Sequence, residues 1–366
     1  MKAVVLGAGR MGSAICLAMR ELQFEVLVLD VSQEALDAAQ KLVPETKTAP
    51  VENVENIFKR LEGENGIDVV ISSLPYHQNK EVGIWCIDNG LRYCDLGGRV
   101  DVSKEINDHA KSISPASAKP VFTDLGLAPG WVNILAEQGY QEMDCESIDS
   151  VQMMVGGIPG VASSPPLNYL NTWSIEGLIN EYKDNCEVLV GSNIVVVQGL
   201  EGLETVRSHI IEEELEAFYT SGGASHTIAS MKERGVKDCY YKTLRYKGHA
   251  EFVKFLMRTC KLSDEVLADI FTKASNSNMP GDIVVVKAIV KSGPLTWERE
   301  YMVPHDDTFS AMQMATAFPI SSVAALMGDG DLDHLSSVTY ADVPIQKFND
   351  NLNKLGDFGR YRYPFF

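Results

Sequence analysis

The stretch Lys2-Ala-Val-Val-Leu-Gly-Ala-Gly-Arg-Met-Gly12 decides the fold of the first part of the chain. Residues 2–6 form an apolar run that is typical of a buried parallel strand, and residues 13–22 have the pattern of a helix. A second apolar run at residues 25–29 ends on Asp30. A strand, a G-x-G-x-x-G turn, a helix and a strand that ends on an acidic residue together make the fingerprint of a dinucleotide-binding fold.

Each glycine of this turn has a separate task. Gly7 permits the tight turn, Gly9 lets the backbone approach a pyrophosphate, and Gly12 lets the helix and strand pack closely. Arg10 and Met11 occupy the positions between the last two glycines. The free N–H groups at the start of the helix face the anion, and the helix dipole favours its charge. Residues 7–12 are therefore predicted to bind the phosphates of a dinucleotide.

Asp30 indicates which dinucleotide binds. A carboxylate at this strand end accepts hydrogen bonds from the ribose hydroxyls and repels a 2′-phosphate. The residues that follow, Val31-Ser32-Gln33, include no arginine or lysine that could bind such a phosphate. The sequence therefore predicts NAD rather than NADP as the cofactor.

Apolar runs alternate with helical stretches up to about residue 122. Further strands are expected at residues 47–49, 67–72, 91–94 and 120–122, and helices at 32–42, 53–61 and 79–89. Right-handed crossovers between such strands give a six-stranded parallel sheet with helices on both faces. The fold class predicted for residues 1–125 is thus α/β, a doubly wound Rossmann domain that binds NAD.

Beyond residue 126 the pattern changes to long β-prone segments. These lie at residues 148–155, 194–197, 239–246, 283–291 and 297–303, with helical stretches at 253–260, 264–273 and 309–327. Several of these segments are too far apart in the sequence for tight hairpins, so residues 126–308 are predicted to form an α+β domain with a mostly antiparallel sheet. The C-terminal helices, at about residues 309–366, are expected to pack back on the first domain.

Composition limits the class of protein. The 366 residues should form two domains, because single cores stop growing before this length. A net charge of −18 and an isoelectric point near 4.8 argue against nucleic acid or an anionic membrane surface as a partner. The seven scattered cysteines lack a C-x-x-C, which indicates reduced thiols in a cytoplasm. Because a strand begins at residue 2 and no apolar run approaches about 18 residues, we expect neither a signal peptide nor a membrane span.

Three loops, at residues 72–77, 95–98 and 124–130, follow the carboxyl ends of predicted strands, and ligands of open parallel sheets bind at that edge. The loop at residues 72–77, which contains Ser73-Leu74-Pro75, is expected to run beneath the nicotinamide ribose. Asp95 follows the next strand, where a group of the substrate would lie. A role for Asp95 as a helix cap is the structural alternative.

Five phrases of the sequence resemble one family. They are GLAPGWVN at residues 126–133, GGIP at 156–159, PLNYLNTWS at 166–174, LEAFYT at 215–220 and TLRYKGH at 243–249. Together they resemble the saccharopine dehydrogenase family, and most of all its L-lysine 6-dehydrogenase branch. The resemblance covers about residues 1–355. One departure is Lys247, where the family commonly has a proline that would stiffen the loop before His249.

The resemblance implies an enzyme that oxidises the amine-bearing terminal carbon of lysine or a similar diamino acid with NAD. The imine would then hydrolyse or cyclise. Members of the family are typically homodimers or higher homo-oligomers, in which the second domain makes the subunit contact. An alternative is a saccharopine- or carboxyspermidine-type enzyme, which handles a secondary amine and needs a second cation such as Arg99 or Arg207. From another class, a non-catalytic NAD-sensing module would keep only the cofactor-binding residues.

The chemistry of amine oxidation requires a base, because an ammonium group cannot give up a hydride before it loses a proton. Histidine is the usual choice. His226 is the first candidate, since Gly-Gly-Ala-Ser before it opens a helix and a helix N-terminus lowers the pKa of an imidazole. His249 and His77 are the alternatives, and each of the three could instead be a structural histidine.

A substrate with an α-carboxylate requires a guanidinium that can bind both of its oxygens. Arg245 alternates with Thr243 on a predicted strand, so the two share a face, where Thr243 would hydrogen-bond the substrate and Arg245 would bind its carboxylate. Pairing of Arg245 with a protein carboxylate is the structural alternative. No H-E-x-x-H motif, P-loop or G-x-S-x-G elbow occurs, and no metal is predicted.

Overall fold

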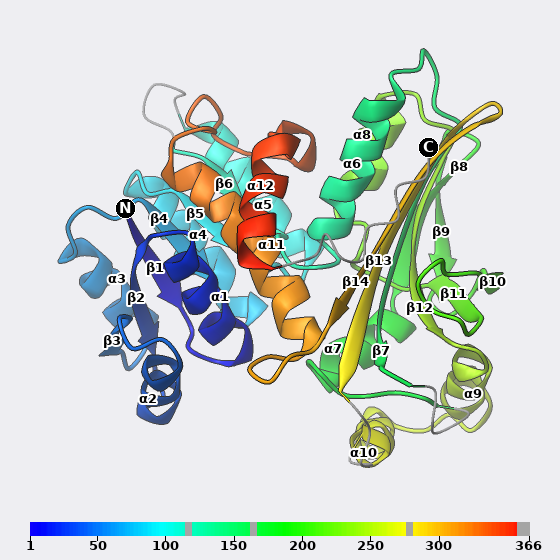
Figure 1. Cartoon of the computed structure of the whole chain (residues 1–366), viewed down its shortest axis with the longest axis horizontal. Helices are drawn as coiled ribbons and strands as arrows, with labels where there is room; N and C mark the ends of the chain where they lie inside the picture. Colours follow the sequence, from blue (N-terminus) through cyan, green and yellow to red (C-terminus); the bar gives the residue numbers. More distant parts are fainter. Residues whose placement is uncertain (114–118, 162–166, 276–280, 357–366) are drawn as a thin grey trace. The chain divides into compact units, whose positions relative to one another are not determined.

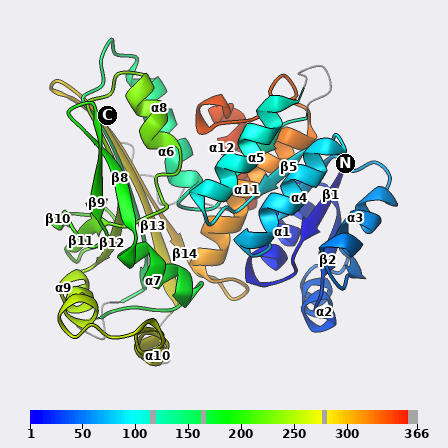
Figure 2. The same ribbon diagram turned by 180° about the vertical axis from the view of Figure 1, so that it is seen from behind.

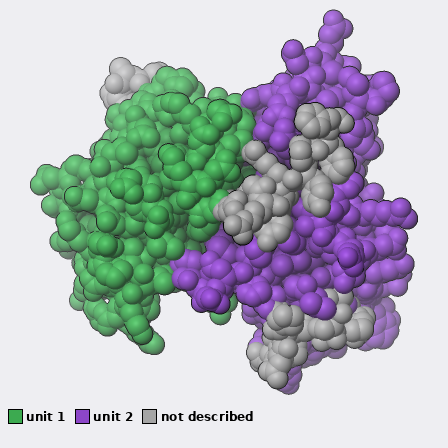
Figure 3. Space-filling view, viewed as in Figure 1, with its two compact units in different colours: residues 1–131, 315–357 green, residues 132–314, 358–366 purple. Residues whose placement is uncertain are grey.

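The computed structural model describes residues 1–113, 119–161, 167–275 and 281–356. Residues 1–131 and 315–357 form unit 1, and residues 132–314 form unit 2 (Figure 3). The divisions fall in the first turn of α6 (Trp131–Met143) and of α11 (Ala311–Gly328). The divisions expected from the sequence lie six residues earlier in each case, at 125/126 and 308/309.

Unit 1 contains a six-stranded parallel sheet in the order β3-β2-β1-β4-β5-β6 (Figure 1). Its strands are β1 (Lys2–Leu6), β2 (Glu25–Asp30), β3 (Lys47–Pro50), β4 (Val69–Ser72), β5 (Tyr93–Asp95) and β6 (Val121–Phe122). The helices between them are α1 (Arg10–Glu21), α2 (Gln33–Leu42), α3 (Val54–Glu62), α4 (Tyr76–Asp88) and α5 (Val100–Ser112). The strand order reverses between β1 and β4, and this is the point at which open α/β sheets bind ligands. The predicted doubly wound sheet is confirmed.

The two faces of this sheet are covered by different helices. The core of one face joins Val4 and Leu6 of β1 to apolar residues of α3, α4 and α5, and α4 packs beside α5 (Figure 2). Helix α1 lies on the other face and contacts α2 and α12 (Ile345–Leu355). The chain beyond α11 also extends the sheet, because Val121 of β6 forms a parallel bridge with Ser337. A 3₁₀ helix, Tyr340–Asp342, precedes α12.

Two helices of unit 1 begin three residues earlier than expected, and one further helix was not expected. Helix α1 begins at Arg10 rather than at residue 13, so the last glycine of the fingerprint lies inside its first turn. Helix α4 begins at Tyr76 rather than at residue 79, directly after Pro75, which is its N-cap. Helix α5 was not predicted, although Arg99 precedes a stretch whose Ile106 and Ala110 are buried. Caps decide helix ends, and they are weaker sequence signals than apolar periodicity.

Unit 2 is built on an eight-stranded sheet with the main order β10-β11-β12-β7-β13-β14, and β8 and β9 form a hairpin beside β12. Its strands are β7 (Ser150–Pro159), β8 (Asn185–Val190), β9 (Asn193–Gln198), β10 (Glu204–Val206), β11 (Leu215–Tyr219), β12 (Asp238–Tyr246), β13 (Asp282–Ser292) and β14 (Leu295–Pro304). Only β7 and β12 pair in parallel among the described strands of this sheet. The predicted mostly antiparallel sheet is confirmed, whereas β8, β10 and β11 were not predicted.

The helices of unit 2 besides α6 are α7 (Ile175–Lys183), α8 (Thr227–Glu233), α9 (His249–Lys254) and α10 (Asp264–Ser275), and a π-helical turn, Phe255–Thr259, continues α9. An apolar core joins α7, α9 and α10 to Phe218 of β11. Asn133 of α6 donates to Thr227 of α8 over 2.9 Å and thereby links these two helices. The sheet of unit 2 is thus accompanied by two groups of helices, one of α7, α9 and α10 and the other of α6 and α8.

Helix α11 corrects one expectation from the sequence. Among the described residues it is the one helix that is long and apolar enough to cross a membrane by length and composition, and 89% of it is buried inside the fold. Gln313, Thr316 and the pair Ser321-Ser322 interrupt its apolar runs, and for this reason no continuous apolar stretch stands out in the sequence. Burial of this degree is that of a core helix.

Candidate active site

The glycine-rich turn in unit 1 has the geometry that a dinucleotide requires. Gly7 has a positive φ of 94° between β1 and α1. A Cβ on Gly12 would lie 1.9 Å from the carbonyl oxygen of Gly7 and 2.7 Å from Ser73 Oγ, so only glycine fits there. A Cβ on Gly9, in contrast, would meet no atom within 4 Å. The turn is therefore tightly packed on its inner side and open at Gly9, where a pyrophosphate would approach.

Asp30 lies at the carboxyl end of β2 and fixes the loops on both sides. Its Oδ2 accepts a hydrogen bond from the backbone N–H of Ala8 (2.6 Å), and its Oδ1 accepts one from the N–H of Ser32 (2.7 Å). Each carboxylate oxygen can accept a further hydrogen bond. The side chain is only part-buried, so it can bind a ribose hydroxyl without leaving these partners.

The loop 73–75 is bonded to the glycine-rich turn. Ser73 Oγ lies 2.9 Å from the carbonyl oxygen of Leu6 and 3.1 Å from that of Gly7, and thus ties the β4 end to the glycine turn. Leu74 packs on the core of unit 1. Because both side chains face the fold, a cofactor would meet this loop mainly through its backbone.

Asp95 is buried at the end of β5, next to a second buried carboxylate, Asp124. Its Oδ1 accepts hydrogen bonds from the N–H of Gly97 (2.8 Å) and of Asp124 (3.2 Å), whereas its Oδ2 has no hydrogen-bond partner among the described residues. Burial, with a smaller effect of the Asp124 charge, raises the pKa of Asp95 to about 7. Such a carboxyl can exchange a proton near neutral pH. Asp95 does not cap a helix, since Arg99 is the N-cap of α5.

In unit 2, β12 carries the predicted pair on one face. Thr243 Oγ1 lies 2.7 Å from Thr220 Oγ1 and 3.4 Å from the hydroxyl of Tyr241. Arg245 follows two residues later on the same face and is buried, with 4% of its surface exposed. The opposite face of β12 packs in a separate apolar core through Leu244 and Tyr246. The structure therefore brings Thr243 and Arg245 together as expected from strand alternation.

Arg245 is a buried cation that has no carboxylate partner among the described residues. Its Nε donates to the Tyr182 hydroxyl (3.2 Å), its Nη1 donates to the carbonyl of Leu244 (2.9 Å), and its guanidinium carbon lies 5.6 Å from the centre of the Tyr169 ring. Two of the five guanidinium N–H groups are thus used by the protein. Buried charges are normally paired, so the remaining N–H groups are suited to an anionic ligand.

His249 and Tyr182 fix the edge of this guanidinium. His249 Nδ1 faces the carbonyl oxygen of Leu167 at 2.7 Å and must carry a proton, so its Nε2, 3.0 Å from the Tyr182 hydroxyl, accepts. Tyr182 then donates to His249 and accepts from Arg245. Burial and the charge of Arg245 lower the pKa of His249 to about 3, and burial raises the pKa of Tyr182 to about 12. Both rings therefore keep these roles throughout the working pH range.

Glu216 holds the loop that carries His249. This buried glutamate of β11 accepts hydrogen bonds from the N–H groups of Gly248 (2.9 Å) and Ala250 (2.6 Å) at the start of α9. Gly248 has a positive φ of 98°. Lys247, the departure from the family pattern, is exposed and 3.8 Å from Glu214. The position of His249 is thus fixed from both sides without a proline before Gly248.

His226 lies at the N-cap of α8, at the start of the predicted helix, with its Nδ1 3.3 Å from Ser225 Oγ. The loop before it packs on the Thr243 side of β12, because a Cβ on Gly223 would lie 2.3 Å from the Tyr241 ring. Asn133 Nδ2 holds this loop from behind through the carbonyls of Gly223 (3.3 Å) and residue 224 (3.0 Å).

The remaining candidates, His77, Arg99 and Arg207, are exposed residues. His77 is an exposed residue in the first turn of α4, beside Tyr76. Arg99 pairs with Asp101 on the surface of unit 1 (2.7 Å), and Arg207 is an exposed residue of unit 2. Pro166, the first residue of the phrase at 166–174, lies outside the described residues.

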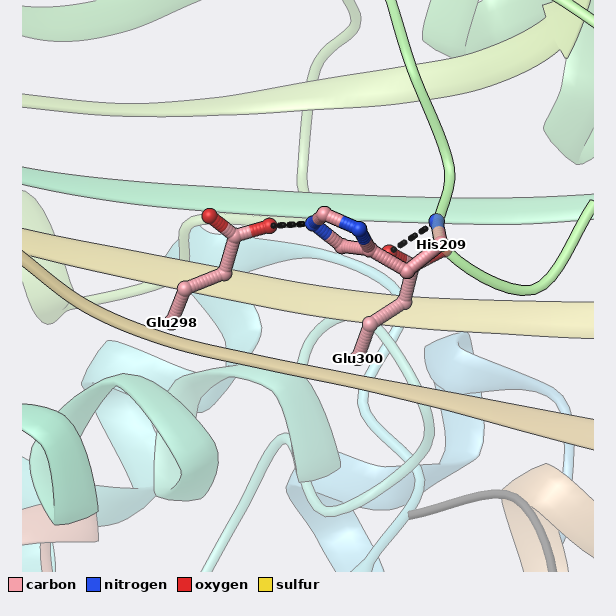
Figure 4. A group of neighbouring side chains, drawn as sticks. All are labelled: His209, Glu298 and Glu300. Carbon is pink, nitrogen blue, oxygen red and sulfur yellow. Dashed lines mark hydrogen bonds and ion pairs between the residues drawn. The ribbon is translucent and has the colours of Figure 1, made fainter. Parts of the chain in front are cut away.

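A group of metal-ligating residue types in unit 2 forms an ion-pair network with a lysine. His209, Glu298 and Glu300 lie close enough to share an ion, and Figure 4 shows the histidine ring pointing toward Glu298. However, Lys287 Nζ lies 2.6 Å from Glu298 and 3.1 Å from Glu300, so a cation of the protein already occupies this position. Glu300 also accepts from the N–H of His209 (3.2 Å) and from Ser208 Oγ. The group fastens the segment before β11 to the sheet.

Several of these residues could not be recognised from the sequence. Tyr182 lies on α7 and Glu216 lies on β11, and neither of these elements was predicted. The one available signal was the Leu-Glu-Ala-Phe-Tyr-Thr phrase at residues 215–220, in which a glutamate interrupts an apolar run. A glutamate inside such a run is buried and needs a partner.

Comparison with known proteins follows this geometry. A model of the saccharopine dehydrogenase NADP binding domain matches residues 3–119, and a model of the saccharopine dehydrogenase C-terminal domain matches residues 126–357. The saccharopine dehydrogenase (NADP(+), L-glutamate-forming) of Saccharomyces cerevisiae is 26% identical over 224 residues, which are 56% of this chain and 46% of the relative. The enzyme of the same description from Pyricularia oryzae is 25% identical over 205 residues, 54% of this chain and 44% of the relative. The chain thus spans about half the length of these curated relatives.

Among solved structures, the apo, histidine-tagged saccharopine dehydrogenase (L-Glu forming) from Saccharomyces cerevisiae superimposes with a TM-score of 0.73. The match covers 96% of both chains at 16% sequence identity. At this identity the likeness shows a common fold for the whole chain.

Proposed function

The chain belongs to the saccharopine dehydrogenase family, and we propose that it is an NAD-dependent dehydrogenase that oxidises the terminal amine of lysine or of a similar diamino acid. The observation that carries this proposal is Arg245. Its guanidinium is buried, is held at one edge by Tyr182, and has no carboxylate partner among the described residues. A substrate with an α-carboxylate would supply the missing charge through two parallel hydrogen bonds.

The cofactor assignment rests on unit 1. The open side of the turn at Gly9 and the tight packing at Gly12 suit the pyrophosphate of a nicotinamide dinucleotide. The matching family model is named for NADP, whereas this chain has Asp30 at the ribose position and no basic residue at 31–33. A carboxylate there favours the free ribose hydroxyl of NAD over the 2′-phosphate of NADP.

Three residues of unit 2 have separate roles in the proposed reaction. Bound nicotinamide would supply a hydride acceptor for the carbon that bears the amine. Before that, the substrate ammonium must lose a proton, and His226 at the start of α8 is proposed to take it. Arg245 holds the α-carboxylate, and Thr243, already bonded to Thr220, adds a hydroxyl to the substrate. The product imine then hydrolyses to a semialdehyde or cyclises.

Two alternatives make different demands on the same residues. A secondary-amine enzyme of the saccharopine or carboxyspermidine type needs a second cation for a second carboxylate. Arg99 is paired with Asp101, and Arg207 is exposed, so neither is presented as Arg245 is. A non-catalytic NAD sensor would have no need of a buried arginine that lacks a carboxylate partner.

A substrate screen tests the proposal. Reduction of NAD and of NADP is followed at 340 nm with lysine, ornithine, saccharopine and carboxyspermidine. We expect turnover with lysine or ornithine and a preference for NAD. Turnover of saccharopine alone would replace the proposal by the secondary-amine alternative. NAD binding without turnover of any amine would favour the sensor.

A further inference from the structure

Asn133 of α6 is a buried amide that holds the chain on both sides of His226. Its Nδ2 lies 2.9 Å from Thr227 Oγ1, 3.0 Å from the carbonyl oxygen of Ala224 and 3.3 Å from that of Gly223. Thr227 follows His226 directly, and the other two residues precede it. Carbonyl oxygens only accept hydrogen bonds, so the NH₂ group of Asn133 must face this segment. Its two protons therefore bridge the loop before His226 to the start of α8.

The loop before His226 has a backbone that needs such support. Gly222 and Ser225 both have a positive φ, of 86° and 45°. A positive φ is unfavourable for a residue with a Cβ such as Ser225, and it persists where surrounding contacts fix the chain. The N–H of Ser225 donates to the carbonyl of Gly222, and the N–H of Thr227 donates to that of Ala224, each over 3.0 Å. Both of these bonds lie within the segment, whereas Asn133 ties it to a second helix.

The same loop is also attached to β12. A Cβ on Gly223 would lie 2.3 Å from the Tyr241 ring, so the backbone of the loop approaches this ring closely. The Tyr241 hydroxyl in turn lies 3.4 Å from Thr243 Oγ1. Contacts on α6 and on β12 thus set where the loop lies relative to the face of the sheet that carries Thr243 and Arg245.

We propose that Asn133 is a positioning residue, which fixes the imidazole of His226 for removal of a proton from the ammonium group of the substrate. This inference rests on the proposed function, in which His226 is the base. The proton passes to an imidazole nitrogen, and the electron pair of the broken N–H bond stays on the amine nitrogen. A base must be within hydrogen-bond reach of the proton that it takes, and a displacement of about 1 Å can lower the rate about a hundredfold.

Asn133→Ala should lower kcat for lysine and leave binding intact. At pH 7.5 we expect kcat to fall about tenfold to a hundredfold, with KM for lysine and Kd for NAD within about twofold, because Arg245 and the glycine turn are untouched. The loss should shrink toward pH 10, since an amine with an ordinary pKa of about 10.4 then loses its proton to water and needs no base. An equal loss at every pH would contradict the inference.

Gln138→Ala is the matched control. Gln138 is a buried amide of the same helix, and its Nε2 donates to Glu142 (2.6 Å) rather than to the loop. Its kcat should equal that of the unmodified protein within about twofold at each pH. A loss in this variant as large as that in Asn133→Ala would show that α6 supports the fold and would overturn a specific role of Asn133.

The double variant shows whether Asn133 acts through His226. In a His226→Asn background, Asn133→Ala should lower kcat no further than about twofold, because residues that act as one unit are not additive. A further tenfold loss would contradict the inference and leave the proposed function intact. A near-normal rate in His226→Asn alone would remove the base assignment, and the inference with it.

Hydrogen exchange gives a readout that needs no turnover. The backbone amides of residues 222–230 should exchange faster in Asn133→Ala than in the unmodified protein, and not in Gln138→Ala. Thr227→Val keeps the shape of the side chain and loses one acceptor, so it should show the same effects to a smaller degree and serves if Asn133→Ala does not fold. If the unmodified protein oxidises no amine, the proposed function fails and exchange alone decides the role of Asn133: unchanged exchange at residues 222–230 would overturn it.

Discussion

Arg245 donates through Nε to the hydroxyl of Tyr182 over 3.2 Å, and Tyr182 in turn donates to His249 at 3.0 Å. With Nη1 also bonded to the carbonyl of Leu244, the plane of the guanidinium is fixed on the protein side. Both protons of Nη2 and one of Nη1 stay available for a ligand. This is the geometry of a preorganised carboxylate site, in which little ordering remains to be done when the ligand binds.

Removal of the Tyr182 hydroxyl should weaken carboxylate binding at Arg245 without leaving a cavity in the apolar core. Tyr182→Phe keeps the ring among its apolar neighbours but leaves Nε of Arg245 and Nε2 of His249 without this partner. A neutral hydrogen bond is worth about 0.5–1.5 kcal/mol, so kcat/KM for lysine should fall severalfold, chiefly through KM. Cadaverine should be unaffected. Tyr246→Phe is the control, since its hydroxyl bonds Pro159 on the opposite face (3.0 Å). A similar loss on cadaverine would show that Tyr182 acts on the fold.

Two glycine substitutions should separate folding from cofactor binding. Gly12→Ala places a methyl group 1.9 Å from the carbonyl oxygen of Gly7, and overpacking of this kind costs about 1–3 kcal/mol. Gly9→Ala meets no atom within 4 Å and should leave the thermal midpoint unchanged while it weakens dinucleotide binding. Thermal unfolding and cofactor titration of both variants check this. A destabilised Gly9→Ala with normal NAD affinity would contradict the assigned roles.

Asp30→Ala should weaken NAD binding and narrow the gap to NADP. The change removes an acceptor for the ribose and a charge that repels a 2′-phosphate. Dissociation constants for both cofactors, from fluorescence titration, measure the effect. Ser32→Ala is a suitable control, because it removes the N-cap of α2 and leaves the carboxylate in place. An unchanged ratio of the two constants would show that Asp30 does not meet the ribose.

Asp95 should make the stability of the protein depend on pH. Its pKa rises from an ordinary value near 3.8 to about 7 in the folded chain, because of burial and then of Asp124. The folded state thus holds this proton more tightly, so the stability that the neutral carboxyl contributes is complete below pH 3.8 and is lost as the pH rises through 7. Asp95→Asn has a neutral side chain at every pH, so it cannot lose this contribution to stability. The thermal midpoint of the variant minus that of the unmodified protein should therefore be larger at pH 8 than at pH 5. A difference that does not depend on pH would contradict the assignment.

The sequence was informative wherever a local pattern is sufficient. The glycine turn, the apolar strands and Asp30 are close in sequence, and the structure has them as expected. Strand alternation likewise placed Thr243 and Arg245 on one face. Tyr182 could not be found in this way, because α7 reaches β12 only through the tertiary fold. Its neighbours in sequence, Asn180, Glu181 and Lys183, make the segment look like an ordinary surface helix.

Arg245→Lys tests the central claim most directly. Lysine keeps the positive charge but loses the planar fork that binds two carboxylate oxygens. The measurement is kcat/KM for lysine and for cadaverine, with NAD, in the unmodified protein and in Arg245→Lys. A charged hydrogen bond is worth about 1.5–3 kcal/mol, so the value for lysine should fall roughly tenfold to a hundredfold, and the value for cadaverine should hardly change. Equal losses on the two substrates would contradict the account and place Arg245 in the fold rather than in the site.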